Sequence, residues 1–548
     1  MKTLLLLTAG FALAQAPDAQ VPIPAKGSIS GMVRDFDTGA PVAGADISAS
    51  NPPARPVGGV TDAQGRFTLS NIDAGRIQLS ANAPRIQGAG FPPLARKFVT
   101  LGQGQQVESI EVQVRTIAQI SGVVTDQNDQ PVPDISVFLV AREYQLGELR
   151  YIFAAPARTD DQGKYTLNSA PGRTYLLLAT RSPGRADAIS SAPADPRLRR
   201  PSVVPTYYPG VDTVAGAQAI TLQSGDKREN LNIKLQRAAS LCAEGSLSAT
   251  GAPGEVTFNY AEASPHSGSS GDGGLFVGSN SGKTEADGKV RICDLHPGQY
   301  RFQVYDTPTA LGTPATFGTG LATVTDRDGA IVFSSLPKVK VPGEMIWAEE
   351  PPASFTIPAN SNLIISPLTR APFREETRAT PLQLAPFTMD LFGDDYTVQR
   401  PTLPAGVYLK DITYGDKSVL RAPFHPGSAV GDAKLKVILA HDGGTLNAHV
   451  ADKEGKPMAD QFVILLPANI TSEVTFADAA ISGQTDQNGS WTSASLAPGK
   501  YYVLASRTPF DRTPETIGGL WRARVKAKDI EIAPKARVDV TIEPIAIQ

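Results

Sequence analysis

A seven-residue turn motif occurs four times in this chain and constrains its fold more than any other feature. It reads T-D-A-Q-G-R-F at 61–67, T-D-D-Q-G-K-Y at 159–165, T-E-A-D-G-K-V at 284–290 and T-D-Q-N-G-S-W at 485–491. In every copy a second glycine turn follows the motif glycine after 9 or 10 residues. A polar turn, an alternating strand and another turn at fixed spacing are typical of antiparallel β-structure. The motif therefore predicts an array of small β domains.

The second turn gives the number of domains. Its glycines are Gly75, Gly172, Gly298, Gly406 and Gly499, which lie 97, 126, 108 and 93 residues apart. In the copy that ends at Gly406, the first turn is degraded, so this unit is visible only through its second turn. A chain of 548 residues is too long for a single core, and its length alone suggests about four domains. The spacing favours five.

Each unit opens and closes with alternating segments that place one face in a core and the other in solvent, and none shows a sustained helical period. About seven strands per hundred residues predicts a two-sheet sandwich. The expected fold is all-β, a tandem array of about five seven-stranded Greek-key β-sandwich domains, immunoglobulin-like or prealbumin-like in type. We place the units at 26–117, 118–237, 238–338, 339–440 and 441–548, and call them units one to five. Units three and four diverge from the repeat.

The first residues resemble a secretory signal peptide. Lys2 precedes a short apolar run, and Ala12 and Ala14 form a small-x-small cleavage site. We therefore predict a signal peptide over 1–14, a linker over 15–25, and a protein exported to the periplasm, cell surface or exterior. No stretch of the sequence is long enough to span a bilayer. The 51 basic and 54 acidic residues give a net charge of −3, which disfavours a nucleic-acid partner.

The chain has two cysteines, Cys242 and Cys293, and both lie in unit three. In an oxidising compartment an isolated even pair predicts a disulfide. Closing this loop of roughly fifty residues would remove about 4 kcal/mol of unfolded-state entropy. The alternative is two buried free thiols, and either arrangement is structural.

The repeated pattern G-x-V-x-D, G-x-P-V, T-D-x-x-G-x-F/Y and P-G-x-Y resembles the carboxypeptidase regulatory-like domain, a transthyretin-like, carbohydrate-binding-like fold. Units one, two and five match well, whereas units three and four match only in their second halves. The arrangement of units is similar to that of large exported proteins of soil bacteria, notably acidobacteria. The resemblance implies a sandwich fold and implies little about function.

No catalytic or metal-binding constellation stands out in the sequence. The five histidines are His266, His296, His425, His441 and His449, and none has the H-E-x-x-H spacing of a zinc peptidase. The Asp and Asn residues that recur at turns lack the distal carboxylate of a calcium loop and suit turn formation instead. We therefore expect no metal, no cofactor and no enzymatic activity.

Aromatic side chains are the strongest ligand-binding candidates, because sugars stack on exposed rings. Trp491 occupies the position of Phe67 in the repeat and is expected in the core. Packing between neighbouring domains is the competing role for the remaining candidates, which are Trp347, Trp521, Tyr207 and Tyr208.

These observations favour a non-catalytic exported protein that acts as a scaffold or adhesion module in the cell envelope or outside the cell. Its partner would be a cell-surface protein. The alternative is a carbohydrate-binding protein that recognises a cell-wall or environmental polysaccharide.

Overall fold

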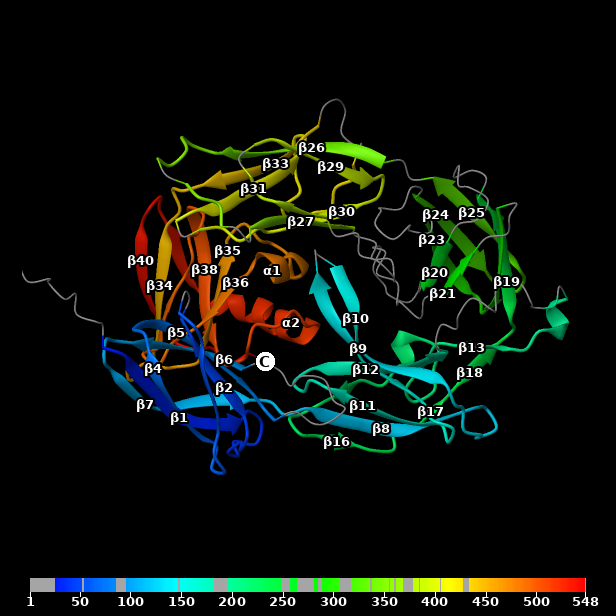
Figure 1. Cartoon of the computed structure of the whole chain (residues 1–548), viewed down its shortest axis with the longest axis horizontal. Coiled ribbons are helices and arrows are strands. Elements are labelled where there is room, and N and C mark those ends of the chain that lie inside the picture. The colour runs from blue at the N-terminus through cyan, green and yellow to red at the C-terminus, as the bar shows by residue number, and fades with distance from the viewer. Residues whose placement is uncertain are drawn as a thin grey trace, which may run out of the picture.

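The computed structural model shows an all-β protein with two short helices, as the sequence predicts (Figure 1). It describes residues 25–547 apart from 52–53, 85–94, 146–147, 182–192, 194, 248–256, 264–279, 284–287, 306–316, 336–337, 354, 359–360, 368–377, 384, 405 and 427–432. The predicted signal peptide and most of the linker after it, together with His266 and the third copy of the turn motif up to residue 287, lie outside the described residues.

Units one and two each contain two main sheets. Unit one consists of β1 (Gly27–Asp35), β2 (Asp46–Ser50), β3 (Val57–Val60), β4 (Arg66–Ile72), β5 (Gly75–Asn82), β6 (Ala95–Leu101) and β7 (Gln106–Val114). Unit two consists of β8 (Ala118–Thr125), β9 (Ile135–Gln145), β10 (Glu148–Arg158), β11 (Lys164–Ser169), β12 (Thr174–Arg181), η2 (Pro196–Leu198), β13 (Ser202–Val204), β14 (Thr206–Tyr207), η3 (Val214–Gly216), β15 (Ile220–Thr221), β16 (Lys227–Arg228), β17 (Ile233–Lys234) and β18 (Gln236–Ala238).

The remaining units complete the chain. Unit three consists of β19 (Leu241–Ser246), β20 (Thr257–Ala263), β21 (Asn280–Lys283), β22 (Lys289–Leu295), β23 (Gly298–Tyr305), β24 (Phe317–Val324) and β25 (Gly329–Ser335). Unit four consists of β26 (Lys338–Trp347), β27 (Asn362–Pro367), β28 (Arg378–Pro381), β29 (Phe387–Phe392), β30 (Tyr396–Gln399), β31 (Tyr408–Tyr414), β32 (Lys417–Ser418) and β33 (Leu435–Ala440). Unit five consists of β34 (Thr445–Val450), β35 (Phe462–Pro467), α1 (Glu473–Ala479), β36 (Ile481–Gln484), β37 (Ser490–Thr492), β38 (Gly499–Ser506), α2 (Pro514–Ala523), η5 (Arg524–Lys526), β39 (Lys528–Ile532) and β40 (Arg537–Ile542).

All five units share one three-strand arrangement. The opening strand lies between an antiparallel strand from the middle of the unit and a parallel strand from its end. The five arrangements are β4-β1-β7, β11-β8-β16, β22-β19-β25, β29-β26-β33 and β37-β34-β40. The divergent units three and four therefore keep the topology of the others although they have lost part of the repeated sequence.

Units three and four differ from the expected pair of separate sheets. In unit three, β24 pairs with both β23 and β25, so the unit forms one continuous seven-stranded sheet. In unit four, β31 leaves the second sheet and pairs with β33. In both units, a strand from the second half of the unit, β24 or β31, thus joins the sheet that contains the opening strand.

The threonine of the turn motif joins the two sheets of its unit. Its buried hydroxyl makes two hydrogen bonds to the backbone just before the second sheet begins. Thr61 Oγ1 donates to the Val42 carbonyl at 2.7 Å and accepts from the Ala45 N–H at 2.9 Å. Thr159 and Thr485 make the same two bonds at equivalent positions in units two and five. A hydroxyl is needed here because these buried backbone groups would otherwise lack partners.

The aspartate and glycine of the motif shape the turn itself. In unit two, Asp160 Oδ1 accepts from the backbone N–H groups of Gln162 at 2.9 Å and Lys164 at 2.8 Å. Gly163 has a φ of +68°, and a Cβ there would lie 2.5 Å from the Val124 carbonyl oxygen. Only glycine fits this close approach to the opening strand. The motif is thus a requirement of the fold.

Buried hydrophobic residues form separate clusters, and the fully buried members of each lie within one predicted unit. Trp491 is buried in unit five opposite Ala448, as Phe67 is opposite Gly31 in unit one. One partly buried residue, Tyr144 of unit two, packs on a cluster of unit five. The cores therefore follow the repeat, and a direct contact links two units that are distant in sequence.

The two helices of unit five are not expected from the sequence. Ser472 caps α1, and Thr513 followed by Pro514 caps α2, through hydroxyls that accept from the N–H groups of Thr475 and Thr516. The basic residues from Arg522 to Lys526 therefore lie in α2 and η5 and not in a strand. Of that cluster, Lys528 begins a strand, β39, at the edge of its sheet.

The five units follow one another around a ring, and unit five returns to lie beside unit one (Figure 1). Strands β5 and β6 of unit one face β36 and β38 of unit five, and α1 and α2 lie toward the middle of the ring. The array is therefore folded back on itself and is not an extended rod.

Replacing the motif threonine should destabilise its unit. We expect Thr159→Val to lower the free energy of unfolding by about 2–3 kcal/mol, because two backbone groups lose their buried partner. Thr159→Ser, which keeps the hydroxyl, serves as the control and should lose less than half of this. Denaturant unfolding and hydrogen exchange of peptides that contain Ile135 measure the effect. Equal stability of the Val variant and the wild type would contradict the role of the hydroxyl.

Candidate functional site

The four aromatic candidates pack within and between units. Tyr207 is 2% exposed and belongs to a buried cluster of unit two, and Tyr208 is partly buried against the main core of that unit. Trp347 meets the rings of Phe355 and His441 edge-to-face, with centroids 4.8 and 5.7 Å away. Little ring surface is free at these positions, and sugar stacking on them stays a prediction.

The fourth candidate, Trp521, lies in α2 and packs on the helical cluster of unit five. Its ring meets Phe476 edge-to-face at 6.0 Å, and the Arg524 guanidinium lies 3.4 Å from the ring centroid on its face. The ring therefore holds the two helices together and stacks with a cation.

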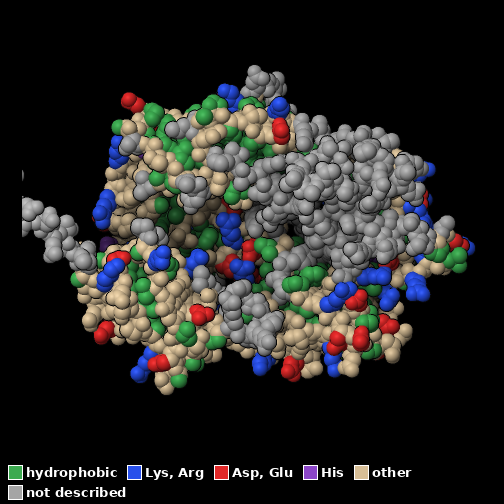
Figure 2. All heavy atoms as spheres, viewed as in Figure 1, with side chains coloured by type: hydrophobic (Ala, Val, Ile, Leu, Met, Phe, Trp, Pro, Cys, Tyr) green, Lys and Arg blue, Asp and Glu red, His purple; other side chains and the backbone are tan. Residues whose placement is uncertain are grey.

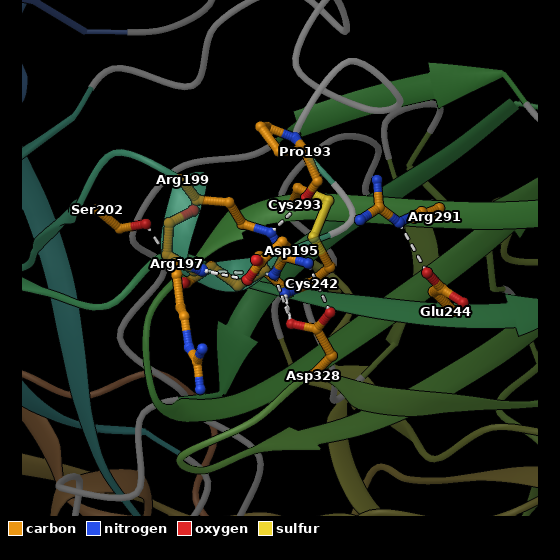
Figure 3. Close-up of polar contacts among 12 residues, drawn as sticks. Pro193, Asp195, Arg197, Arg199, Ser202, Cys242, Glu244, Arg291, Cys293 and Asp328 are labelled. Carbon is orange, nitrogen blue, oxygen red and sulfur yellow. Dashed lines mark hydrogen bonds and ion pairs between the residues drawn. A yellow bond between two sulfur atoms is a disulfide. The ribbon is translucent and has the colours of Figure 1, made fainter.

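The predicted cysteine pair forms a disulfide between adjacent strands of unit three. Cys242 lies in β19 and Cys293 in β22, and their Cα atoms are 4.0 Å apart. The free-thiol alternative therefore does not apply. Figure 3 shows the disulfide beside a buried ion pair that joins unit three to the segment after β12.

Arg199 makes this ion pair with Asp328. The Arg199 side chain is 1% exposed, and its two terminal nitrogens contact the two carboxylate oxygens at 2.6 and 2.8 Å. Asp328 Oδ1 also accepts from the Cys242 N–H at 2.8 Å. Hydrogen bonds from Arg199 and from this N–H hold the pKa of Asp328 below its usual value of 3.8. Asp328 thus links Arg199 to the opening strand of unit three.

Units one and five meet where the turn motif of unit five docks on the edge strand β6. The Gln487 side-chain amide accepts from the Thr100 N–H at 3.0 Å and donates to the Thr100 carbonyl at 2.8 Å. Asp486 Oδ2 accepts from the Thr100 hydroxyl at 2.9 Å, and its other oxygen closes its own turn. The amide thus pairs with the backbone N–H and carbonyl of Thr100 on the edge strand, as a neighbouring strand would.

A buried lysine supports the same contact. Lys97 of β6 is 5% exposed and makes an ion pair with Asp460 of unit five. A buried ammonium is costly without a partner, so the presence of unit five is what satisfies this charge.

Units two and five meet through a charged network beside α2. Arg173, directly before β12, makes ion pairs with Glu143 of its own unit and with Asp511 of unit five, the latter at 3.2 Å. Arg142 reaches Glu515 in the first turn of α2 at 3.1 Å. Figure 2 shows charged side chains of both signs around a hollow near the middle of this face.

A cleft of about 480 Å³ lies between units one and five, next to the Lys97–Asp460 pair. Unit one contributes Phe36, Arg96 and Arg115, among others. Unit five contributes Phe462, Gln484, Arg507, Pro509 and Phe510. Sequence reasoning missed this site because its walls come from segments about four hundred residues apart that carry no shared motif.

A second cavity of about 900 Å³ lies on unit four near His425. Its walls include residues next to both ends of the segment 427–432, which lies outside the described residues. We therefore assign no site there.

The described part of the chain contains no group of three or more His, Cys, Asp or Glu residues that could hold a metal ion. His425 pairs with Asp395 at 3.1 Å, and His441 Nε2 lies 2.9 Å from the Glu350 carbonyl. Within the described ranges, no helix is long and apolar enough to cross a membrane.

The geometry of unit one, with β4-β1-β7 facing β3-β2-β5-β6, agrees with a comparison against known families. Residues 28–115 match the carboxypeptidase regulatory-like domain. The regulatory-like domain is thus unit one, and the other units share its three-strand arrangement. No curated protein matches the sequence.

Several solved structures resemble the chain weakly. The Bacillus anthracis TIE protein is 10% identical, with 97% of this chain and 76% of that chain covered and a TM-score of 0.15. Shaft pilin SpaA from Lactobacillus rhamnosus GG is 12% identical, with coverages of 38% and 97% and a TM-score of 0.17. The minor pilin GBS52 of Streptococcus agalactiae is 10% identical, with coverages of 39% and 96% and a TM-score of 0.21. Likenesses at these TM-scores carry no argument about this chain.

The contact at Thr100 predicts how the ring can be opened. A Lys97→Met/Gln487→Ala double variant removes the buried charge pair and both amide bonds, so unit five should separate from the regulatory-like domain. We expect a larger radius of gyration in small-angle X-ray scattering at unchanged secondary structure. Asn488→Ala is the control and should leave the radius unchanged, because Asn488 lies in the same turn and its side chain makes no hydrogen bond to β6 among the described residues. An unchanged radius in the double variant would show that other contacts close the ring.

The Arg199–Asp328 pair predicts a pH-dependent stability. Because the pKa of Asp328 is lowered by folding, the pair stabilises the protein above the usual carboxyl pKa, and this stability is lost as the pH falls through the folded-state value. Asp328→Asn should therefore cost about 2 kcal/mol at pH 7 and progressively less in acid. Denaturant unfolding and hydrogen exchange around Cys242 measure this.

Glu244→Gln provides the control for this prediction. Glu244 pairs with Arg291 at 2.7 Å on the surface of the same unit (Figure 3), and exposed pairs contribute about 0.5 kcal/mol. Equal losses in the two variants at pH 7 would contradict the importance of burial.

Proposed function

We propose that this chain is a non-catalytic exported scaffold or adhesion protein that presents five β units in a fixed, closed arrangement to a partner at the cell surface. The observation that supports this proposal best is the docking of the Asp486–Gln487 turn on β6. This contact uses a turn that the fold requires in any case, and it fixes the two ends of the array against each other.

The tryptophans that could otherwise bind a ligand pack between and within the units. Trp347 packs where units four and five meet, and Trp521 holds the helices that contact unit two. Ion pairs join unit one and unit two to unit five. A scaffold needs fixed relative positions of its modules, and directional polar contacts supply them.

Retention on intact cells of the producing bacterium tests the proposal. We expect the labelled full-length protein to bind the cell surface and the opened Lys97→Met/Gln487→Ala variant to bind at least fivefold less, because its modules no longer hold their relative positions. Asn488→Ala should bind like the wild type. Equal retention of the opened variant, or a cytoplasmic location of the native protein, would overturn the proposal.

The carbohydrate-binding alternative is favoured by one feature, the cleft between units one and five.

A further inference from the structure

The cleft between units one and five has the size of a small-ligand site. Its volume of about 480 Å³ lies within the range of roughly 300–1,000 Å³ that is usual for such sites. Its walls come from two domains, and domain interfaces are a preferred location for ligand sites. The cleft exists only because the ring is closed.

Several charged residues line the cleft, and two of them, both arginines, have no charged partner among the described residues. Lys97 pairs with Asp460. Glu111 pairs with Arg34 at 3.2 Å and accepts a hydrogen bond from Gln113 at 3.1 Å.

One of the three arginines at the cleft, Arg115, contacts neighbouring side chains of its own unit. The guanidinium of Arg115 lies 3.9 Å from the ring centroid of Phe36, and its Nε lies 4.0 Å from a carboxylate oxygen of Asp37. Arg96 and Arg507 remain: both are exposed, and neither makes an ion pair or side-chain hydrogen bond within the described ranges.

These two arginines come from different domains and line the same cleft. Arg96 lies in β6 next to the buried Lys97, and Arg507 follows β38 directly. Two positive charges that line one small cleft repel each other. An anion bound between them would attract both and offset this repulsion. Guanidinium groups bind carboxylate and sulfate or phosphate oxygens with directed, often bidentate, hydrogen bonds.

The rest of the lining suits the body of a sugar. Phe462, Pro509 and Phe510 are half-buried and give the cleft flat apolar surfaces on which ring C–H faces can pack. The Gln484 side chain, which makes no hydrogen bond in the described part of the chain, offers an amide to hydroxyl groups. Apolar faces with a few polar groups around them are typical of specific small-ligand sites.

We propose that this cleft binds an anionic oligosaccharide, with Arg96 and Arg507 contacting its acidic groups. The negative charge is a carboxylate, as in a uronic acid, or a sulfate ester, and both present the same oxygen geometry to the two arginines. The inference does not depend on the scaffold function, since a ligand could bind here whatever the protein assembles with.

Isothermal titration calorimetry on the full-length protein tests this. The probes are a uronic-acid oligosaccharide, a sulfated oligosaccharide, a neutral oligosaccharide of the same length, and citrate. We expect binding of at least one anionic oligosaccharide that weakens as the salt concentration rises. Arg96→Gln and Arg507→Gln should each weaken it about tenfold, because a charge-assisted contact is lost.

Matched controls are available in the same two domains. Arg66→Gln in β4 and Arg537→Gln in β40 remove exposed strand arginines that do not line the cleft, and both should bind like the wild type. Melting temperatures and scattering curves of all four variants show whether each is folded and closed.

Three outcomes would overturn the proposal. The first is the absence of binding by either anionic oligosaccharide. The second is equal binding of the neutral oligosaccharide, or of citrate, which would show that the acidic sugar is not what is recognised. The third is equal weakening by the control variants, which would place the interaction elsewhere on the surface.

Discussion

In units one, two and five, the fold depends on one buried hydroxyl in the repeated turn. The motif threonine donates to one backbone carbonyl and accepts from one backbone N–H, both just before the second sheet, in units one, two and five. The turn that carries it leads into the strand that pairs with the opening strand of the first sheet. One side chain therefore fixes the two layers of the sandwich relative to each other, and the rest of each core packs around that arrangement.

The features that the sequence predicts correctly are those that a local pattern determines. Glycine turns, strand alternation and the aromatic position of Phe67, Tyr165 and Trp491 each follow from a few neighbouring residues, so the all-β fold is predictable. The disulfide is predictable for a similar reason, because two cysteines in one unit have a single possible pairing. Units three and four have a weak sequence pattern but keep the common strand order, so the predicted repeat of the fold holds for them as well.

What the sequence does not predict depends on contacts between distant segments. Nothing local marks Gln487 as the partner of β6, since the same position is Ala63 in unit one and Asp161 in unit two. The two short helices were missed because their period is brief, although Thr513 and Pro514 form a recognisable helix start. Arg96 and Arg507 look like ordinary surface arginines in sequence. Only the folded chain places them in one cleft.

The closing contact also has a temporal consequence. Lys97 and Asp460 are 363 residues apart, so units two, three and four and the start of unit five must be synthesised before the edge of unit one is covered. Domains emerge and fold from the N-terminus, and long-range contacts form last. During this interval β6 is an unpaired edge that could pair with another chain. Until Asp460 is present, Lys97 on that strand is a charge without its partner. Burying this charge is costly, which disfavours packing of a foreign strand against the edge.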